Sequence, residues 1–428
     1  TLVGRRDGSS VFEEGNKYAF FPSVGAAWRI GQESFMQGID YISNLKLRVS
    51  YGIVGEQGVP AYNSLSRFTP YVTFLNNQVS NAVLLENLAS SNLDWETTTQ
   101  TDIGLEIGFL NNRYSLELDY YNKRTKDLLL NRPIPGTAGE TRLENVGEIE
   151  NKGFEFTINS LNIDKPDFTW STNLTISANK NKVISIGDGQ EFITLDNPNG
   201  SSGPSIRIIP GYPAPAYLGA TYLGTYRTTA EIDADGVVGS VLGGPRYVDL
   251  DGNGAINQLD FIVHGDPNPD FYGGLRNTLT YKDFTLDFFF HGAYGNEILN
   301  AAYHLGYFGR DPRSNLLPIV KDRWTTSNQN SDIPRAGSSF GNYQQRSDVS
   351  YQDGSFLRLK NVTLTYDLDI PGMKRASVYV TGNNLLLFTK FTHGDPEQSN
   401  YGDGLAQGVA NGGYPYNSSF ALGFNLTL

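Results

Sequence analysis

Apolar and polar residues alternate along most of this chain. In residues 45–53, 102–109 and 114–120, every second side chain is apolar and the residues between are charged, Ser or Gly. A period of two is typical of a β-strand whose two faces meet different surroundings. No stretch of helix length shows the 3.6-residue period of an amphipathic helix. The pattern predicts strands at about eleven places: 24–30, 45–53, 102–109, 114–120, 154–158, 168–178, 275–281, 284–290, 361–368, 377–382 and 418–428.

The connections between these predicted strands fall into two length classes. Short ones lie at 110–113, 162–167, 282–283 and 371–374. Long ones lie near 54–97, 124–150, 181–268, 294–353 and 388–417. Short and long connections alternate, which is typical of an outer-membrane barrel with short periplasmic turns and longer extracellular loops. A soluble β-sandwich or β-helix with one solvated face is the alternative.

We therefore predict an all-β fold, in which residues 1–428 form the C-terminal portion of a large antiparallel transmembrane β-barrel. A further strand fragment is expected at residues 1–6. An odd number of strands that starts in mid-pattern does not close a bacterial single-chain barrel, in which the strand number is even. On this prediction the C-terminus lies on the periplasmic side of a bacterial outer membrane, and outer-membrane lipid surrounds the strands of the barrel.

Composition narrows the class of protein. The charged fraction of 18% is below the ~25% of typical globular proteins, while the chain has 25 Tyr, 24 Phe and 47 Gly. The net charge of −12 argues against nucleic acid as a partner, because phosphates require a basic surface. The chain has no Cys, so neither disulfides nor thiolate metal sites are expected. The chain has no run of about 18 apolar residues, so no transmembrane helix is predicted.

Several blocks carry a family resemblance, and they occur in order along the whole chain. They include FFPSVGAAWRI (20–30), LKLRVSYGIVG (45–55), NLDWETTTQTDIGLEIGFLNNR (92–113), GDPNPDFYGGLRNTLTYKDFTLDFFFHGAYGNEILN (265–300), DGSFLRLKNVTLTYDL (353–368) and VYVTGNNLLLFTKF (378–391). With these blocks the chain resembles the C-terminal half of SusC/RagA-type TonB-dependent outer-membrane transporters of the Bacteroidetes group.

The resemblance implies a plugged barrel of the 22-stranded type that imports oligosaccharides or peptides. It also implies a SusD-like surface lipoprotein as partner and energy supplied by TonB, ExbB and ExbD. The signal peptide, the N-terminal extension, the TonB box and the plug domain of such transporters have no counterpart in this chain. A passive porin-like channel and a calcium-stabilised cell-surface binding protein are the alternatives.

One motif predicts a metal site. The segment DLDGNGAINQLD (249–260) has the ligand spacing of an EF-hand calcium loop, with Gly254 at the sixth position. Asp260 replaces the usual final Glu, and no helix pattern flanks the loop. We expect a structural Ca²⁺ that orders a long loop, and the alternative is a turn whose side chains cap their own backbone. The expected ligands are Asp249, Asp251, Asn253, Ala255, Asn257 and Asp260.

Aromatic residues in the long connections are candidates for stacking on a substrate. The candidates are Tyr212, Tyr217, Tyr222, Tyr303, Tyr307 and Trp324, with Tyr226 and Phe308 beside them. Their alternative role is to pack the loops together. His264, His291, His304 and His393 lack the spacing of metal ligands, and no Ser/His/Asp set is suggested. We therefore expect no enzyme activity and no other cofactor.

Overall fold

A computed structural model describes residues 1–62, 65–87, 89–90, 92–133, 141–195, 205–308, 315–336, 347–398 and 407–427. The chain divides into two compact units. Unit 1 comprises Thr1–Ile158, Asn179–Ile193 and Ile209–Tyr212, and unit 2 comprises Asn159–Ala178, Thr194–Ile208 and Pro213–Leu428. Each unit is described by itself below.

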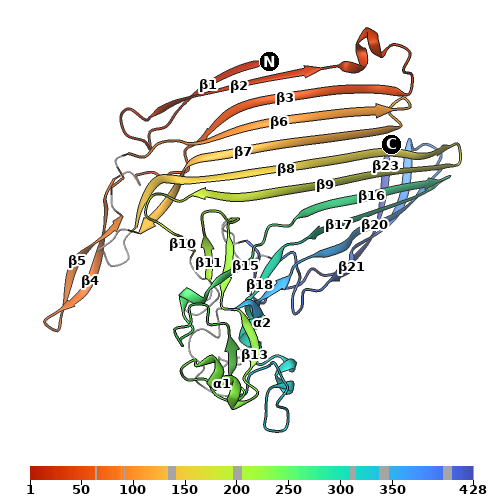
Figure 1. The fold of residues 1–428 in the computed structure, drawn as a ribbon. Helices are drawn as coiled ribbons and strands as arrows, with labels where there is room; N and C mark the ends of the chain where they lie inside the picture. Colours follow the sequence, from red (N-terminus) through yellow and green to blue (C-terminus); the bar gives the residue numbers. More distant parts are fainter. Residues whose placement is uncertain are drawn as a thin grey trace. The chain divides into compact units, whose positions relative to one another are not determined.

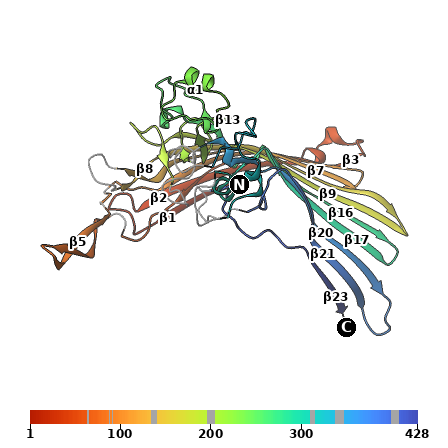
Figure 2. The ribbon, with the colours of Figure 1, turned by 90° about the horizontal axis from the view of Figure 1, so that it is seen from below.

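The main element is a 12-stranded sheet, called the wall here, whose strands follow one another in chain order. Its strands are β1 (Leu2–Gly8), β2 (Tyr18–Trp28), β3 (Ile42–Glu56), β6 (Glu96–Phe109), β7 (Tyr114–Pro133), β8 (Thr141–Lys165), β9 (Phe168–Ser185), β16 (Phe271–Tyr281), β17 (Phe284–Tyr294), β20 (Phe356–Leu368), β21 (Arg375–Thr389) and β23 (Ser419–Thr427). Figure 1 shows β1, β2, β3, β6 and β7 of unit 1 side by side, and Figure 2 shows β16, β17, β20, β21 and β23 of unit 2. A wall strand occupies every place where alternation predicts one, and β1 covers the fragment at 1–6, so the all-β prediction is confirmed.

The predicted connections are mostly found, with one correction. Turns follow β6 at 110–113 and β16 at 282–283, and positive φ angles at Leu110, Asn111, Asn112 and Lys282 let the chain reverse there. The connection predicted at 124–150 is wrong, because β7 continues to Pro133 and β8 starts at Thr141. The strands keep pairing after the apolar alternation ends. The connection at 54–97 contains a separate hairpin of β4 (Arg67–Leu75) and β5 (Gln78–Asn87).

The long connections of unit 2 fold into small elements that we call the loop cluster. Its strands are β11 (Ser205–Ile208), β12 (Ala216–Gly219), β13 (Tyr222–Thr225), β14 (Pro245–Tyr247), β15 (Ile262–Gly265), β18 (Glu297–Asn300), β19 (Tyr351–Asp353) and β22 (Val409–Ala410), and its helices are α1 (Thr229–Asp235) and α2 (Ala301–Phe308). The other elements among the described residues are β10 (Ile193–Thr194) and 3₁₀ turns at Ile30–Gln32, Ser34–Met36, Gln258–Asp260, Pro318–Asp322 and Asp348–Ser350. Sequence alternation does not predict the helices, because seven and eight residues are too few to show a stripe. Among the described residues, no helix has the length and apolar run needed to span a bilayer.

The two faces of the wall differ as the alternation predicts. On one face, Arg48 of β3 forms ion pairs with Glu106 of β6 (2.7 Å) and Asp119 of β7 (3.1 Å). Arg276 of β16 forms another with Asp287 of β17 (2.7 Å). The opposite face presents exposed apolar side chains, among them Val49, Ile103, Phe154, Leu364 and Phe424. A polar face backed by an exposed apolar face is the arrangement of a barrel wall in lipid.

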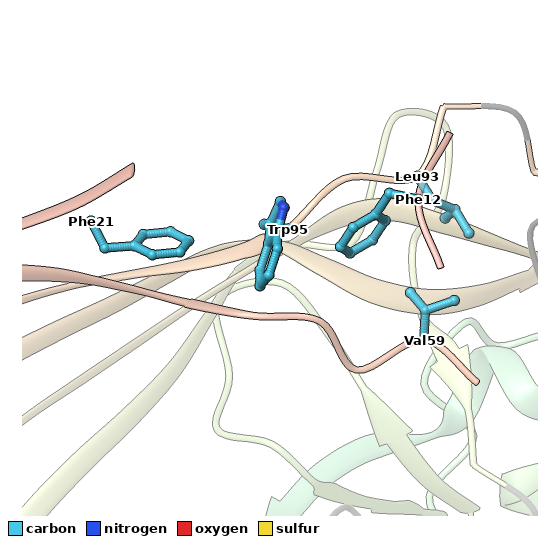
Figure 3. Packing of buried hydrophobic residues seen from close by; sticks show 5 residues of the cluster. All are labelled: Phe12, Phe21, Val59, Leu93 and Trp95. Carbon is cyan, nitrogen blue, oxygen red and sulfur yellow. The ribbon is translucent and has the colours of Figure 1, made fainter. Parts of the chain in front are cut away.

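A buried aromatic cluster in unit 1 holds connections against the end of the wall. Trp95 lies between Phe12 and Phe21, with ring centroids 5.2 and 5.6 Å away (Figure 3). Val59 and Leu93 complete the cluster. The indole Nε1 of Trp95 donates to the carbonyl of Asn16 at 3.0 Å. The cluster therefore joins three connections that are distant in sequence, those around residues 12, 59 and 95.

Candidate functional site

Tyrosines join three long connections within the loop cluster. Tyr217 of β12 stacks on Tyr351 of β19 with centroids 5.1 Å apart and planes 1° from parallel. The Tyr217 hydroxyl lies 3.0 Å from the carbonyl oxygens of both Gln407 and Gly408, to which it can donate. The Tyr351 hydroxyl donates to the carbonyl of Leu218 at 2.8 Å. These contacts hold the segments around β12, β19 and β22 in one arrangement.

The six aromatic candidates occupy different surroundings. Tyr217, Tyr307 and Trp324 are buried, so their rings are covered by other parts of the loops, as the packing alternative describes. Tyr222 is half-buried, and its hydroxyl donates to the carbonyl of Asp332 at 2.5 Å. Tyr212 is 45% exposed, and Tyr303 is half-buried beside Tyr307 and His393. Among the six, Tyr212 is the exposed one, whereas Tyr222 and Tyr303 keep only part of their surface accessible for stacking on a substrate.

The predicted calcium loop lies between β14 and β15. Asp249, Asp251 and Asp260 each bring a carboxylate oxygen to within 4.8 Å of the others. Gly252 and Gly254 have φ angles of 70° and 76°, a region that favours glycine, and their N–H groups donate to Asp249 at 2.9 and 2.8 Å. These bonds, with that from Gly254 first, lower the pKa of the Asp249 carboxyl. Asp249 is therefore ionised over the whole physiological pH range.

The other three expected ligands bond within the loop. Asn253 accepts from the Ala255 N–H at 2.8 Å and donates to Asp251 at 2.7 Å. The carbonyl of Ala255 accepts from the Asn257 side chain at 3.0 Å. These bonds are the backbone and side-chain caps that the turn alternative requires. The three carboxylates form an oxygen-only donor set, which fits a hard cation such as Ca²⁺.

Asp260 is the buried member of this set. It is 0% exposed, and its two oxygens accept from the N–H groups of Leu250 (2.8 Å) and Asn257 (2.7 Å). It thereby joins the two ends of the loop. Burial of a carboxylate is costly unless hydrogen bonds or a cation offset it, and here two backbone donors do so.

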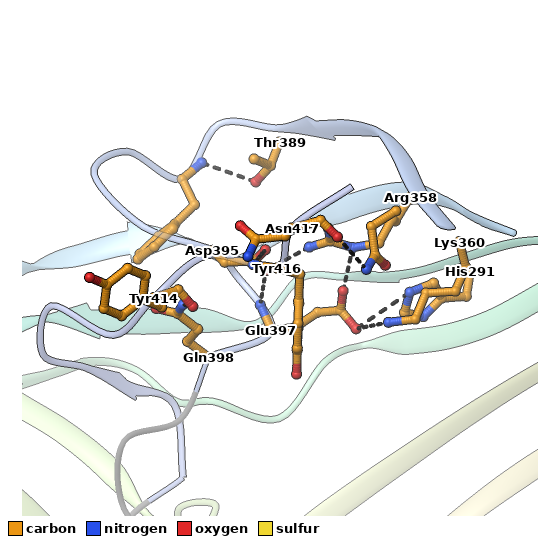
Figure 4. A network of polar contacts seen from close by, with 12 residues as sticks. His291, Arg358, Lys360, Thr389, Asp395, Glu397, Gln398, Tyr414, Tyr416 and Asn417 are labelled. Atoms are coloured by element: carbon orange, nitrogen blue, oxygen red, sulfur yellow. Dashed lines mark hydrogen bonds and ion pairs between the residues drawn. The ribbon is translucent and has the colours of Figure 1, made fainter. Parts of the chain in front are cut away.

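A second polar network, which the sequence patterns do not indicate, fixes the last long connection to the wall. Arg358 of β20 and Asp395 have side chains only 2% exposed, and the guanidinium donates to the carboxylate at 2.6 Å. Arg358 also pairs with Glu397, whose other oxygen lies 3.4 Å from His291 Nε2 of β17 (Figure 4). Burial raises the pKa of the Glu397 carboxyl, but His291, Arg358 and Lys360 outweigh it and lower the pKa below its ordinary value.

Tyr416 completes this network from the far end of the same connection. Its ring lies 5.4 Å from the guanidinium carbon of Arg358 and 4.9 Å from the Nζ of Lys360. Its N–H donates to Asp395 at 3.3 Å. Arg358 thus holds two parts of the connection, around residues 395 and 416, against β17 and β20.

Glu297 of β18 is an acidic residue with an unusual environment. Burial first, then the charges of Asp266 and Asp353, raise its pKa to about 7. Among the described residues its Oε2 has no hydrogen-bond partner. Glu297 is therefore largely protonated in a mildly acidic medium and ionised in a mildly alkaline one.

The histidines occupy separate places. His264 Nε2 lies 3.0 Å from the carbonyl of Gly219, His291 contacts Glu397, and His393 lies beside the Tyr303 ring. The side chain of His304 lies outside the described part of the chain.

Comparison with known proteins identifies the family. The family model described as TonB dependent receptor-like, beta-barrel, matches residues 1–385. TonB-dependent receptor P26 of Formosa agariphila is 41% identical over 100% of this chain and 44% of its own length. TonB-dependent receptor SusC of Bacteroides thetaiotaomicron is 28% identical over 100% of this chain and 42% of its own length.

A solved structure of the RagAB peptide transporter matches this fold with a TM-score of 0.82 and 25% identity. The match covers 100% of this chain and 45% of that chain. The chain thus spans less than half the length of these relatives, and proteins of this family reside in the outer membrane. It belongs to the TonB-dependent receptor-like β-barrel family.

Proposed function

We propose that the intact protein is a SusC-type nutrient importer that takes up oligosaccharides or peptides across the outer membrane with energy from TonB, ExbB and ExbD. The observation that carries this proposal is the likeness to the RagAB peptide transporter over the whole chain, at a TM-score of 0.82. The identity of 41% with a TonB-dependent receptor supports the energised mechanism. The two-sided wall supports a location in lipid.

The loop cluster supports a role in substrate capture at the outer surface. Tyrosines and buried ion pairs give its segments a fixed shape, and a fixed surface binds a ligand with less loss of entropy. We assign a SusD-like surface lipoprotein as the partner that covers these loops. Since β23 starts at the loop end of the wall, the C-terminus then lies on the periplasmic side.

Calcium is assigned a structural role in this proposal. Asp249, Asp251 and Asp260 supply three oxygens from one loop. A bound Ca²⁺ would neutralise their mutual repulsion and hold the segment between β14 and β15. The site lies within the connection that contains β11 to β15, which favours a role of the ion in ordering these loops.

Uptake by a deletion strain tests the proposal. A strain that lacks the gene should lose growth on one class of oligosaccharide or peptide, and the intact gene should restore it. Restoration should fail in a strain without ExbB, because import needs energy. Restoration without ExbB would instead indicate a passive channel. Unimpaired growth of the deletion strain on every candidate substrate, with loss of cell-surface binding, would indicate a binding protein.

A further inference from the structure

Two glycines lie side by side on the apolar face of the wall in unit 2. Gly273 of β16 pairs with Gly292 of β17, and the same cross-strand row continues to Ile176, Leu357 and Phe388. Paired residues of adjacent strands point to the same face. The row therefore lacks side chains on its two central strands and carries large apolar side chains on either side.

The neighbouring rows make this gap a trough. Toward the loop end, Phe271 and Tyr294 pair across β16 and β17, and their rings stack with centroids 5.2 Å apart. On the other side, the paired residues Leu174, Leu275 and Phe290 close the trough. A cavity of about 1010 Å³ lies here, and these side chains line it.

The trough opens toward lipid. His291, the neighbour of Gly292, points to the opposite face, where it contacts Glu397. The trough face carries exposed apolar residues along the same strands, including Leu364 and Val380. It is therefore continuous with the surface that a barrel of this family presents to the membrane.

The neighbouring backbone leaves no room for a side chain at either glycine. A Cβ atom at Gly273 would overlap the carbonyl oxygen of Thr175, and one at Gly292 would overlap that of Phe356. A glycine inside a strand weakens it and often marks a close approach of backbone or ligand. The close approach of the neighbouring backbone explains why glycine occupies both positions. The trough above them results from their missing side chains. An empty trough would leave its walls without dispersion contacts.

We propose that this trough is a binding site for one acyl chain of a membrane lipid. The apolar walls fit a hydrocarbon chain. Lys390, whose side chain is 86% exposed, lies at the loop-end rim in an ion pair with Asp353 at 3.7 Å. The lipid headgroup then lies beside Lys390, with its chain directed away from the loops along the glycine pair.

Photo-crosslinking in the intact transporter tests the proposal. The protein is reconstituted in vesicles that contain phosphatidylglycerol with a diazirine in one acyl chain. After irradiation and digestion, adducts should be several-fold more frequent at Leu357 and Phe388 than at Leu364. Leu357 and Leu364 are a matched pair, since both lie on the same face of β20 and both are 47% exposed.

Trough-filling variants separate a site from ordinary lipid contact. Leu357→Trp, and independently Phe388→Trp, should lower the adducts in the trough several-fold, whereas Leu364→Trp should leave them unchanged. Heat-modifiable migration on a gel checks that each variant folds. Equal labelling of the Leu357 and Leu364 positions, or labelling of the trough that neither filling variant lowers, would overturn the proposal.

Discussion

Arg358 pairs with Asp395 and Glu397 of the last long connection, and its side chain is buried. Removal of one partner from a buried ion pair costs about 3–5 kcal/mol, because the other charge remains buried and unpaired. We predict that Arg358→Met frees residues 390–398 from the wall. Hydrogen exchange in this segment should become faster, and trypsin should cleave sooner after the exposed Lys390.

Arg276 offers the matched control on the same face of the wall. Its pair with Asp287 is exposed on the Arg276 side, and exposed pairs contribute only about 0–1 kcal/mol. Arg276→Met should leave the exchange of residues 390–398 unchanged. Equal protection of that segment in both variants would show that the Arg358 pair does not fix it.

Glu297 makes the loop cluster sensitive to pH. Its pKa of about 7 lies above the ordinary value of 4.5, so the folded state keeps the proton over a range in which the unfolded state has lost it. Local stability therefore falls as the pH rises from about 4.5 to about 7, and the full loss persists above 7.

We predict that Glu297→Gln removes this dependence. Exchange of residues 297–300, corrected for the intrinsic effect of pH, should be slower than in the unmodified protein at pH 8 and similar at pH 4.5. Glu191→Gln, at an exposed position, serves as control and should have no effect on these residues. A pH dependence that persists in Glu297→Gln would assign it to another group.

At the scale of elements, alternation reveals strands only where their two faces meet different surroundings. Residues 102–109 and 114–120 alternate because one side faces lipid and the other faces ion pairs, and both were predicted. The continuation of β7 through Lys126 has no such difference between faces, so the sequence suggested a loop. The strands of three or four residues in the loop cluster are too short for any period.

The candidate sites divide in the same way. The predicted calcium loop spans twelve residues, so local spacing reveals its carboxylates. Arg358 and Asp395 are 37 residues apart, and no local pattern connects them. Aromatic residues suit both substrate stacking and packing, so only the structure separates the buried Tyr217 from the exposed Tyr212.

The aromatic cluster of unit 1 allows a test of how connections are held. Trp95→Ala would remove a buried ring and leave a cavity, at a cost of about 3–5 kcal/mol. We predict faster hydrogen exchange at residues 11–17 and 57–60, both of which adjoin the cluster. Trp28→Ala is the control, because Trp28 is exposed on β2. Unchanged exchange at both segments in Trp95→Ala would contradict the role of the cluster.

Addition of a chelator tests whether the predicted calcium loop binds an ion. If Ca²⁺ binds, chelation should loosen residues 227–268, because the carboxylates of Asp249, Asp251 and Asp260 then repel one another. Limited proteolysis of the intact protein, with and without chelator, measures this. Asp251→Asn should lower the sensitivity to chelator, whereas Asp233→Asn, on the exposed side of α1, should not. Identical cleavage with and without chelator would leave only the turn alternative.

At the scale of the whole molecule, the proposed import would require the wall and the loops to act together. We predict that Arg358→Met lowers substrate uptake in the complemented deletion strain, because a freed connection presents a less ordered capture surface. Uptake at a series of substrate concentrations should show a raised KM, with less effect on the maximal rate. Arg276→Met should retain normal uptake. A normal KM in Arg358→Met would show that substrate capture does not depend on the order of this connection.

The tyrosine contacts of the loop cluster have a consequence for evolution. The hydroxyls of Tyr217, Tyr351 and Tyr222 all bond to carbonyl oxygens of the main chain. Every amino acid supplies such a carbonyl, so the accepting positions are free to change their side chains while the bonds persist. Homologous chains can therefore change the side chains around Gln407 and Asp332 and still keep the same loop architecture.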